Sequence, residues 1–174
     1  MAFFLAQVNY WIIVLMGVSG TGKSTIGIEL SQMLEIPFLE GDDIHSVANK
    51  NKMKAGIPLV DEDRLPWLEG LREINDQSRK NLVLSCSALK RSYRDILIDH
   101  KNRTFFVHLH APYRVIEERL SLRKEHFFNP QLLKDQFEKL ELLEEKETGI
   151  QINVDQSIDL VVAEISRSLN HLLV

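Results

Sequence analysis

The chain has 174 residues, a net charge of −4, 44% apolar and 26% charged residues, and one cysteine, Cys86. Its length predicts a single domain over residues 1–174, and its composition is that of a globular protein and indicates neither disorder nor a membrane protein. The negative charge argues against non-specific binding of nucleic acid, which needs a basic face. The single cysteine excludes an internal disulfide and is typical of the reducing cytoplasm, where we expect the protein to act.

The N-terminal segment Met1–Leu5 is apolar and, together with Tyr10–Met16, could be taken for a signal peptide. No Lys or Arg precedes it, and no convincing small-residue cleavage site follows. Gln7 and Asn9 interrupt the apolar run, which is also too short to span a membrane. We therefore expect neither export nor binding to a membrane, and we interpret residues 11–16 as a buried first strand.

The following residues, 17–24, read G-V-S-G-T-G-K-S and fit the phosphate-loop pattern G-x-x-x-x-G-K-S/T. A predicted strand enters this loop and a helical pattern leaves it, so backbone N–H groups would converge on an anion beside a helix N-terminus with about half a positive charge. Lys23 is expected to reach the β- and γ-phosphates, and the Ser24 hydroxyl to bind Mg²⁺. A glycine-rich turn that matches by chance is the alternative. The residues expected to bind a nucleoside triphosphate are Gly17, Val18, Ser19, Gly20, Thr21, Gly22, Lys23, Ser24 and Thr25.

The second predicted strand, 36–40, ends in the acidic sequence E-G-D-D. In an open parallel sheet the carboxyl ends of the strands face the ligand crevice, so these carboxylates should lie beside the phosphate loop. The third strand, 81–86, ends in S-C-S and supplies no aspartate for Mg²⁺. Glu40 or Asp42 is therefore expected to organise the metal or to accept a proton from an attacking hydroxyl. The alternative is that Asp42 and Asp43 only cap a helix.

The rest of the chain alternates apolar runs with helical patterns, which predicts a parallel α/β sheet covered on both faces. Two more strands are expected, at 104–109 and 150–154. Helices are expected near 23–34, 66–79, 91–99, 112–124, 130–145 and 157–172. The apolar face of the 130–145 helix, which we interpret as core packing, consists of Leu132, Leu133, Gln136, Phe137, Leu140 and Leu143. Residues 41–65 are polar and irregular, and such long segments are often functional.

Several motifs together resemble the gluconate kinases (gluconokinases), small P-loop sugar-acid kinases related in fold to shikimate and nucleoside monophosphate kinases. The most specific are D-x-D-R-x-P-W-L at 61–68 and C-S-A-L-K-x-x-Y-R-D at 86–95. The other matching positions are Gly17–Ser24, 40–43, His45, Asn49, Lys52, Met53, Gly56, Pro58, Leu59, Arg123, His126, Phe127, Leu132, Leu133, Gln136 and Phe137. About the last 25 residues carry no diagnostic match.

The resemblance implies a three-layer P-loop kinase fold, with a five-stranded parallel sheet flanked by helices. It also implies a substrate-binding segment at about 41–80, a short lid at about 119–131, and a homodimer. Two positions depart from the family pattern: Glu40 stands where the family commonly has aspartate, and Glu125 stands where it has glycine. We expect the geometry around Glu40 to adjust to one extra methylene, whereas Glu125 puts a detailed picture of lid closure in doubt.

The activity that the resemblance implies is transfer of the γ-phosphoryl group of ATP to the 6-hydroxyl of D-gluconate, giving 6-phosphogluconate and ADP. Such catalysis depends on alignment and charge stabilisation. Lys23 would stabilise the phosphoryl group, and Asp42 would orient or deprotonate the hydroxyl. Ser24 would bind Mg²⁺ directly, with Glu40 touching its water shell. Arg119 and Arg123, four residues apart on one helix, are candidate lid arginines; ordinary surface ion pairs are the alternative.

The carboxylate of gluconate needs a basic partner, and a planar guanidinium suits it best. Arg64, Lys90 and Arg94 are the candidates, of which Arg64 is preferred because it lies in the expected acceptor segment. His45 either hydrogen-bonds a sugar hydroxyl or has a structural role. Trp67 is expected to anchor the core rather than stack on sugar, and Cys86 to be buried and unreactive.

Two other functions compete with this one. The first is a related kinase for another small acceptor, such as shikimate, a nucleotide or a different sugar acid, which the D-R-x-P-W-L string argues against. The second is a nucleotide-binding regulatory module that has lost catalysis. Such a module would be expected to lose the lysine or the acids, yet Lys23, Glu40 and Asp42 are all present.

Overall fold

The computed structural model describes residues 10–98, 103–122 and 130–173, and these build one parallel sheet between two helical layers. The strands are β1 (Trp11–Met16), β2 (Phe38–Glu40), β3 (Leu82–Ser85), β4 (Arg103–His110) and β5 (Gly149–Asn153). Their order across the sheet is β2-β3-β1-β4-β5, and every adjacent pair is parallel. The predicted five-stranded parallel sheet is therefore confirmed, with β1 at its centre.

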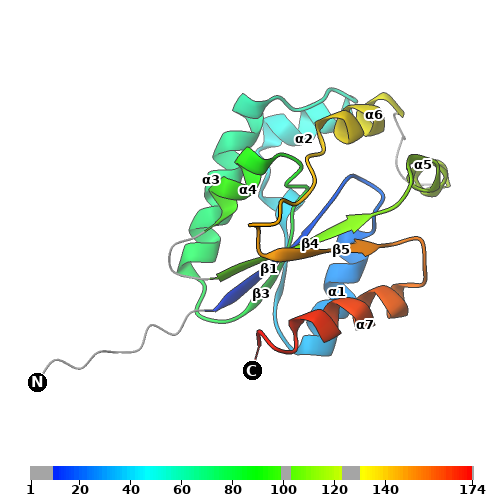
Figure 1. Cartoon of the computed structure of the whole chain (residues 1–174). Coiled ribbons are helices and arrows are strands. Elements are labelled where there is room, and N and C mark those ends of the chain that lie inside the picture. The colour runs from blue at the N-terminus through cyan, green and yellow to red at the C-terminus, as the bar shows by residue number, and fades with distance from the viewer. Residues whose placement is uncertain (1–9, 99–102, 123–129, 174) are drawn as a thin grey trace, which may run out of the picture.

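The helices cover both faces of the sheet and its carboxyl edge (Figure 1). They are α1 (Lys23–Leu34), the 3₁₀ helix η1 (Gly41–Ile44), α2 (Val47–Lys54), α3 (Asp61–Gln77), α4 (Arg91–Leu97), α5 (Tyr113–Ser121), α6 (Pro130–Lys139) and α7 (Ile158–Leu169). One layer contains α1 and α7, and the opposite layer contains α3 and α4. Helices α5 and α6 lie beyond the ends of β4 and β5, where ligands bind in open α/β sheets.

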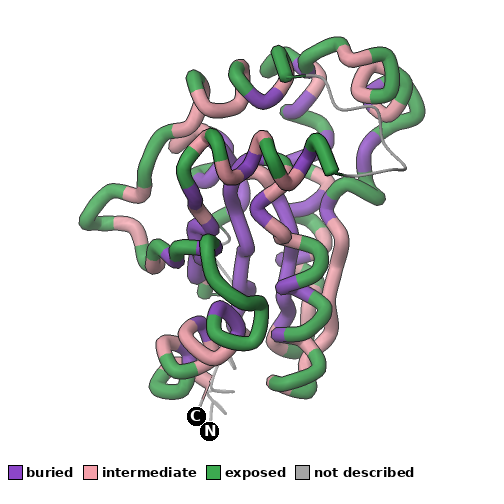
Figure 2. The backbone as a smooth tube through the Cα atoms, turned by 90° about the vertical axis from the view of Figure 1, so that its right-hand side faces the viewer, coloured by how far each residue is buried: buried purple, intermediate pink, exposed green. Residues whose placement is uncertain are grey.

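The core is double, because the sheet is apolar on both faces. All six residues of β1 are buried. Ile13 and Leu15 pack under α1 and α7, whereas Ile12 and Val14 pack under α3 and α4. Figure 2 shows burial concentrated in the strands, with the helices exposing their outer sides. Each fully buried aliphatic side chain contributes roughly 1.5–3 kcal/mol, so the central strand is a rigid platform for the loop that follows it.

The segment 41–65 differs from the prediction, because most of it is helical. Ser46 caps α2, its side chain accepting a hydrogen bond from the Asn49 N–H at 3.1 Å. Helix α3 begins at Asp61 instead of near residue 66, because three acidic residues fill its first turn and favour the positive end of the helix dipole. Pro66 therefore lies inside α3 rather than at its start.

The helix predicted over 130–145 is also shorter, ending at Lys139. The following backbone is used elsewhere: the Glu141 N–H donates to the Leu89 carbonyl at 2.8 Å, and the Glu141 carbonyl accepts from Arg94 at 3.0 Å. Apolar periodicity continues through Leu143, which packs on the α3/α4 core without being helical. A pattern of burial alone could not distinguish the two conformations.

Candidate active site

The phosphate loop joins β1 to α1, and its backbone conformation requires glycine at several positions. Gly20 and Gly22 have φ of 86° and 89°, in the left-handed region that L side chains rarely adopt. A Cβ on Gly17 would lie 2.4 Å from the Leu109 carbonyl oxygen. Helix α1 begins directly after Gly22 with no acidic residue in its first turn, so nothing there neutralises its positive N-terminus. The loop is thus built as an anion cradle.

Lys23 lies folded over this loop. Its ammonium donates to the carbonyls of Gly17 and Val18, both at 3.0 Å. The Thr21 hydroxyl also donates to the Val18 carbonyl, at 2.9 Å. Ser24 and Thr25 are exposed at the start of α1. The ammonium is therefore held at the loop, and the Ser24 hydroxyl is open to a ligand.

Glu40 is held by a residue that the sequence analysis missed. Ser85, buried at the end of β3, donates its hydroxyl to the Glu40 carboxylate and accepts the Gly41 N–H at 3.2 Å. Strand β3 lies between β1 and β2, so Ser85 occupies the strand end at which no aspartate was found. The longer Glu40 side chain therefore reaches a hydroxyl on the neighbouring strand. The polar residue ending an apolar strand was the available signal.

Asp42 follows in η1, and its carboxylate is 65% exposed to solvent. Desolvation by the surrounding protein raises the pKa of Asp42, with a further upward contribution from Glu40, while Lys23 and Arg64 oppose the shift. A raised pKa makes a carboxylate a stronger proton acceptor. Asp42 thus combines access to solvent with proximity to the phosphate-loop lysine.

Basic and aromatic side chains from α3 and from the start of α4 form a cluster around Tyr93. Arg64 is only 8% exposed, and its guanidinium lies 5.8 Å from the centre of the Tyr93 ring. Lys90 lies 5.3 Å from the same ring but is already paired with Asp61 at 2.8 Å. The Tyr93 hydroxyl also donates to Asp61. Among the described residues, no hydrogen bond is formed by the Arg64 guanidinium, so its planar donors remain available.

His45 and Trp67 pack against each other next to Asp42. Their rings stack at 4.0 Å with an angle of 19°, and the Trp67 indole N–H donates to the Gly41 carbonyl at 2.7 Å. Burial, with Arg64 and Lys50 nearby, lowers the pKa of His45 to about 4. His45 is therefore neutral at neutral pH and forms no ion pair with Asp42. Trp67 is buried, as predicted for a core anchor.

Two more predictions concern residues after β3. Arg94 is fully buried and pairs with Glu147 at 2.6 Å, while donating to the carbonyls of Ala88 and Leu89 at 3.3 and 3.4 Å. Its guanidinium therefore fixes the loop before Lys90, and nothing in this arrangement supports a contact with substrate. Cys86 is buried, and burial raises the pKa of its thiol to about 12, in agreement with an unreactive cysteine.

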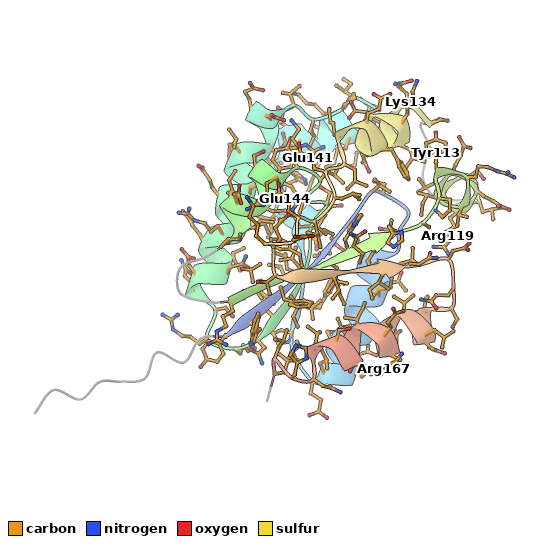
Figure 3. All side chains as sticks on the ribbon, in the orientation of Figure 1. Tyr113, Arg119, Lys134, Glu141, Glu144 and Arg167 are labelled. Atoms are coloured by element: carbon orange, nitrogen blue, oxygen red, sulfur yellow. The ribbon has the colours of Figure 1, made fainter. Side chains whose placement is uncertain are left out.

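Of the two predicted lid arginines, the structure describes Arg119. Arg119 on α5 donates to the Val154 carbonyl at 2.6 Å and lines a cavity of about 290 Å³ beside the phosphate loop. Figure 3 shows Arg119 between α5 and the ends of β4 and β5. The rest of the lining comes from Gly20, Thr21, Gly22, Thr25, Ile26, Val154, Gln156, Ile158 and Val161. Arg123 and Glu125 lie outside the described residues.

The structure describes residues 10–98, 103–122 and 130–173. In these ranges no three His, Cys, Asp or Glu side chains gather to hold a metal. The oxygen donors of Ser24 and Glu40 still fit Mg²⁺, which commonly takes one or two protein ligands plus phosphates and water. None of the helices in these ranges has the length and apolarity needed to cross a membrane.

Comparison with known proteins finds a shikimate kinase family model and several gluconokinases. The shikimate kinase family model matches residues 19–170. A probable gluconokinase of Xenopus tropicalis is 41% identical over 172 residues, covering 88% of this chain and 90% of that protein. The thermoresistant gluconokinase of Escherichia coli K12 is 42% identical over 159 residues, covering 89% and 91%. The crystal structure of a gluconokinase from Sinorhizobium meliloti superposes with a TM-score of 0.86 at 41% identity, covering 95% and 93%.

Proposed function

Because the chain belongs to the gluconokinase family of P-loop kinases, we propose that it transfers the γ-phosphoryl group of ATP to the 6-hydroxyl of D-gluconate. The observation that supports this proposal is that Lys23 of the phosphate loop and Arg64 both lie near enough to Asp42 for their charges to lower its pKa. One site thus combines a phosphate cradle, a proton acceptor and a buried guanidinium. Phosphoryl transfer from ATP to a sugar acid needs each of these groups.

The nucleotide fits on the α1 side of the crevice. The loop N–H groups and the N-terminus of α1 would bind the phosphates, and Lys23 would neutralise charge on the group in transfer. The cavity lined by Arg119 and Gln156 opens next to the same loop and would receive the base. Mg²⁺, held by Ser24 and approached by Glu40 through water, would neutralise phosphate charge when bound.

The acceptor fits on the α3 side. Arg64 would bind the carboxylate with its planar fork, at the opposite end of the substrate from the reacting hydroxyl. Asp42 would orient that hydroxyl and accept its proton. The neutral ring of His45 lies close enough to Asp42, at 3.9 Å, to contact a neighbouring sugar hydroxyl. Lys90 is the less suitable carboxylate partner, since Asp61 already neutralises it.

A panel assay tests the proposal. Purified protein, ATP and Mg²⁺ are incubated with gluconate, its epimers, 5-ketogluconate, shikimate or nucleoside monophosphates, and ADP release is coupled to NADH oxidation. Gluconate should give the highest kcat/KM. A higher value for shikimate or a nucleotide would assign the protein to a related kinase, and no acceptor-dependent release would indicate a regulatory module.

Cellular context and assembly complete the proposal. The family resemblance and the single buried cysteine favour a cytoplasmic homodimer acting in gluconate catabolism. Sedimentation equilibrium at micromolar protein concentration tests the dimer: a mass of one chain at all concentrations would contradict it.

A further inference from the structure

Helix α6 is bonded directly to the phosphate loop through Gln136. The Ser19 backbone N–H donates to the Gln136 side-chain oxygen at 2.7 Å, and the side-chain amide donates back to the Ser19 hydroxyl at 3.1 Å. The two residues are 117 positions apart, so neither bond follows from local structure. The backbone N–H requires an acceptor, which fixes the orientation of the Gln136 amide.

These bonds hold the peptide between Val18 and Ser19 from both sides. Its carbonyl accepts from the Lys23 ammonium at 3.0 Å, while its N–H donates to Gln136. Any rotation of this peptide would break contacts at both ends. Gln136 therefore fixes the part of the loop on which Lys23 rests.

The Gln136 oxygen also occupies a place suited to phosphate. Loop N–H groups bind phosphate oxygens, and 2.7 Å is a typical length for such a bond. A phosphate oxygen bound at this N–H would lie next to Lys23, which contacts the carbonyl of the same peptide and is expected to reach the β- and γ-phosphates. When that phosphate oxygen accepts the hydrogen bond from the Ser19 N–H, the Gln136 side chain can turn and donate from its NH₂ group, because a glutamine amide is both acceptor and donor.

The rest of α6 explains why this amide is held in place. Leu133 is buried in the core, and Phe137 meets Tyr113 of α5 edge-on at 5.2 Å. Gln136 lies between these anchors on the otherwise apolar face. Gln136 is half-buried, and its hydrogen bonds to Ser19 lie at the surface, where a ligand can reach them.

We propose that Gln136 is a positioning residue. Its side-chain oxygen accepts the Ser19 N–H when no phosphate is bound there, and its NH₂ group donates to an oxygen of the terminal phosphate when ATP binds. The protein thereby distinguishes ATP from ADP through α6. This inference rests on the proposed function only in that the loop binds ATP, and it does not depend on which acceptor is phosphorylated.

The test measures nucleotide binding by calorimetry, without acceptor, using the β,γ-imido analogue of ATP and ADP in excess Mg²⁺. Gln136→Ala should weaken binding of the analogue about tenfold, the loss of one hydrogen bond to a charged group, and leave ADP within about twofold. Gln136→Glu keeps the acceptor for Ser19 but adds a negative charge, so it should preserve the melting temperature of the nucleotide-free protein and weaken the analogue further.

The matched control is Lys134→Ala on the same helix. Lys134 is 63% exposed, points away from the sheet in Figure 3, and pairs only loosely with Glu138 at 3.9 Å. Its replacement should leave the ratio of the two dissociation constants unchanged. If Gln136→Ala weakens both nucleotides equally, or neither, Gln136 only supports the fold and the proposal is wrong. Because no acceptor is present, a failure to phosphorylate gluconate would leave this result intact.

Discussion

Replacing Arg64 by lysine should damage gluconate binding selectively. Lysine keeps the positive charge but cannot reproduce the planar pair of donors that binds a carboxylate. Arg64 is 8% exposed and packed against Tyr93, so solvent screens its interaction little and the side chain cannot readily shift to compensate. One hydrogen bond between charged groups contributes about 1.5–3 kcal/mol, so KM for gluconate should rise roughly ten- to hundredfold.

The assay is a two-by-two cycle of enzyme and substrate, with kcat and KM measured for gluconate and for D-glucitol, in which the carboxylate is reduced to an alcohol. Wild-type protein should prefer gluconate strongly, and Arg64→Lys should lose most of that preference while KM for ATP stays nearly constant. Arg72→Lys, at an exposed position of the same helix, is the control. Equal losses for both substrates would refute the assignment and show that Arg64 supports α3 instead.

Three further outcomes are expected. Lys23→Ala should reduce kcat by at least about 10²–10³-fold, because it removes the charge beside the transferred group; a folded variant with a tenth of wild-type kcat would contradict this. Asp42→Asn should lower kcat with little change in ATP binding, whereas Glu40→Gln should raise the Mg²⁺ concentration needed for half-maximal rate; identical Mg²⁺ titrations would refute this division of roles. Burial, with His110 and Arg94 nearby, lowers the pKa of His108 to about 4. As pH falls below about 6.5, His108 is therefore protonated in the unfolded chain but not in the folded one, which favours unfolding. Denaturant titrations should therefore show that, between pH 7.5 and 5.5, the wild-type protein loses roughly 1 kcal/mol more unfolding free energy than the His108→Leu variant.

The sequence predicted the parts of the protein that local pattern controls. The continuous apolar run 11–16, the glycine loop and the helix from Lys23 were correct because burial, backbone conformation and phosphate geometry each restrict the residues allowed. The start of α3 was predicted near Pro66, five residues too late. The three acids ahead of it are the stronger signal.

What the sequence did not reveal concerns contacts between distant segments. Arg94 carries the same charge as Arg64, and only its burial against Glu147 reveals that it serves the fold. Burial raises the pKa of Glu147, but the hydrogen bonds from Arg94 and from the Glu144 N–H, together with the charges of Arg94 and Arg91, more than offset this and lower it. Ser85 and Gln136 likewise contact residues far along the chain. Gln136 did leave a trace, since it was the polar residue on an apolar helix face.

The most direct test of the central claim is the phosphorus NMR spectrum of the product formed from ATP and gluconate. With the carboxylate at Arg64 and the far hydroxyl at Asp42, phosphate should be attached to the terminal carbon. Its signal should then be a triplet, split by the two methylene protons, with one ADP released for each ester formed. A doublet would place the phosphate on a secondary hydroxyl, and free phosphate alone would show transfer to water; either result would contradict the proposed alignment of substrate between Arg64 and Asp42.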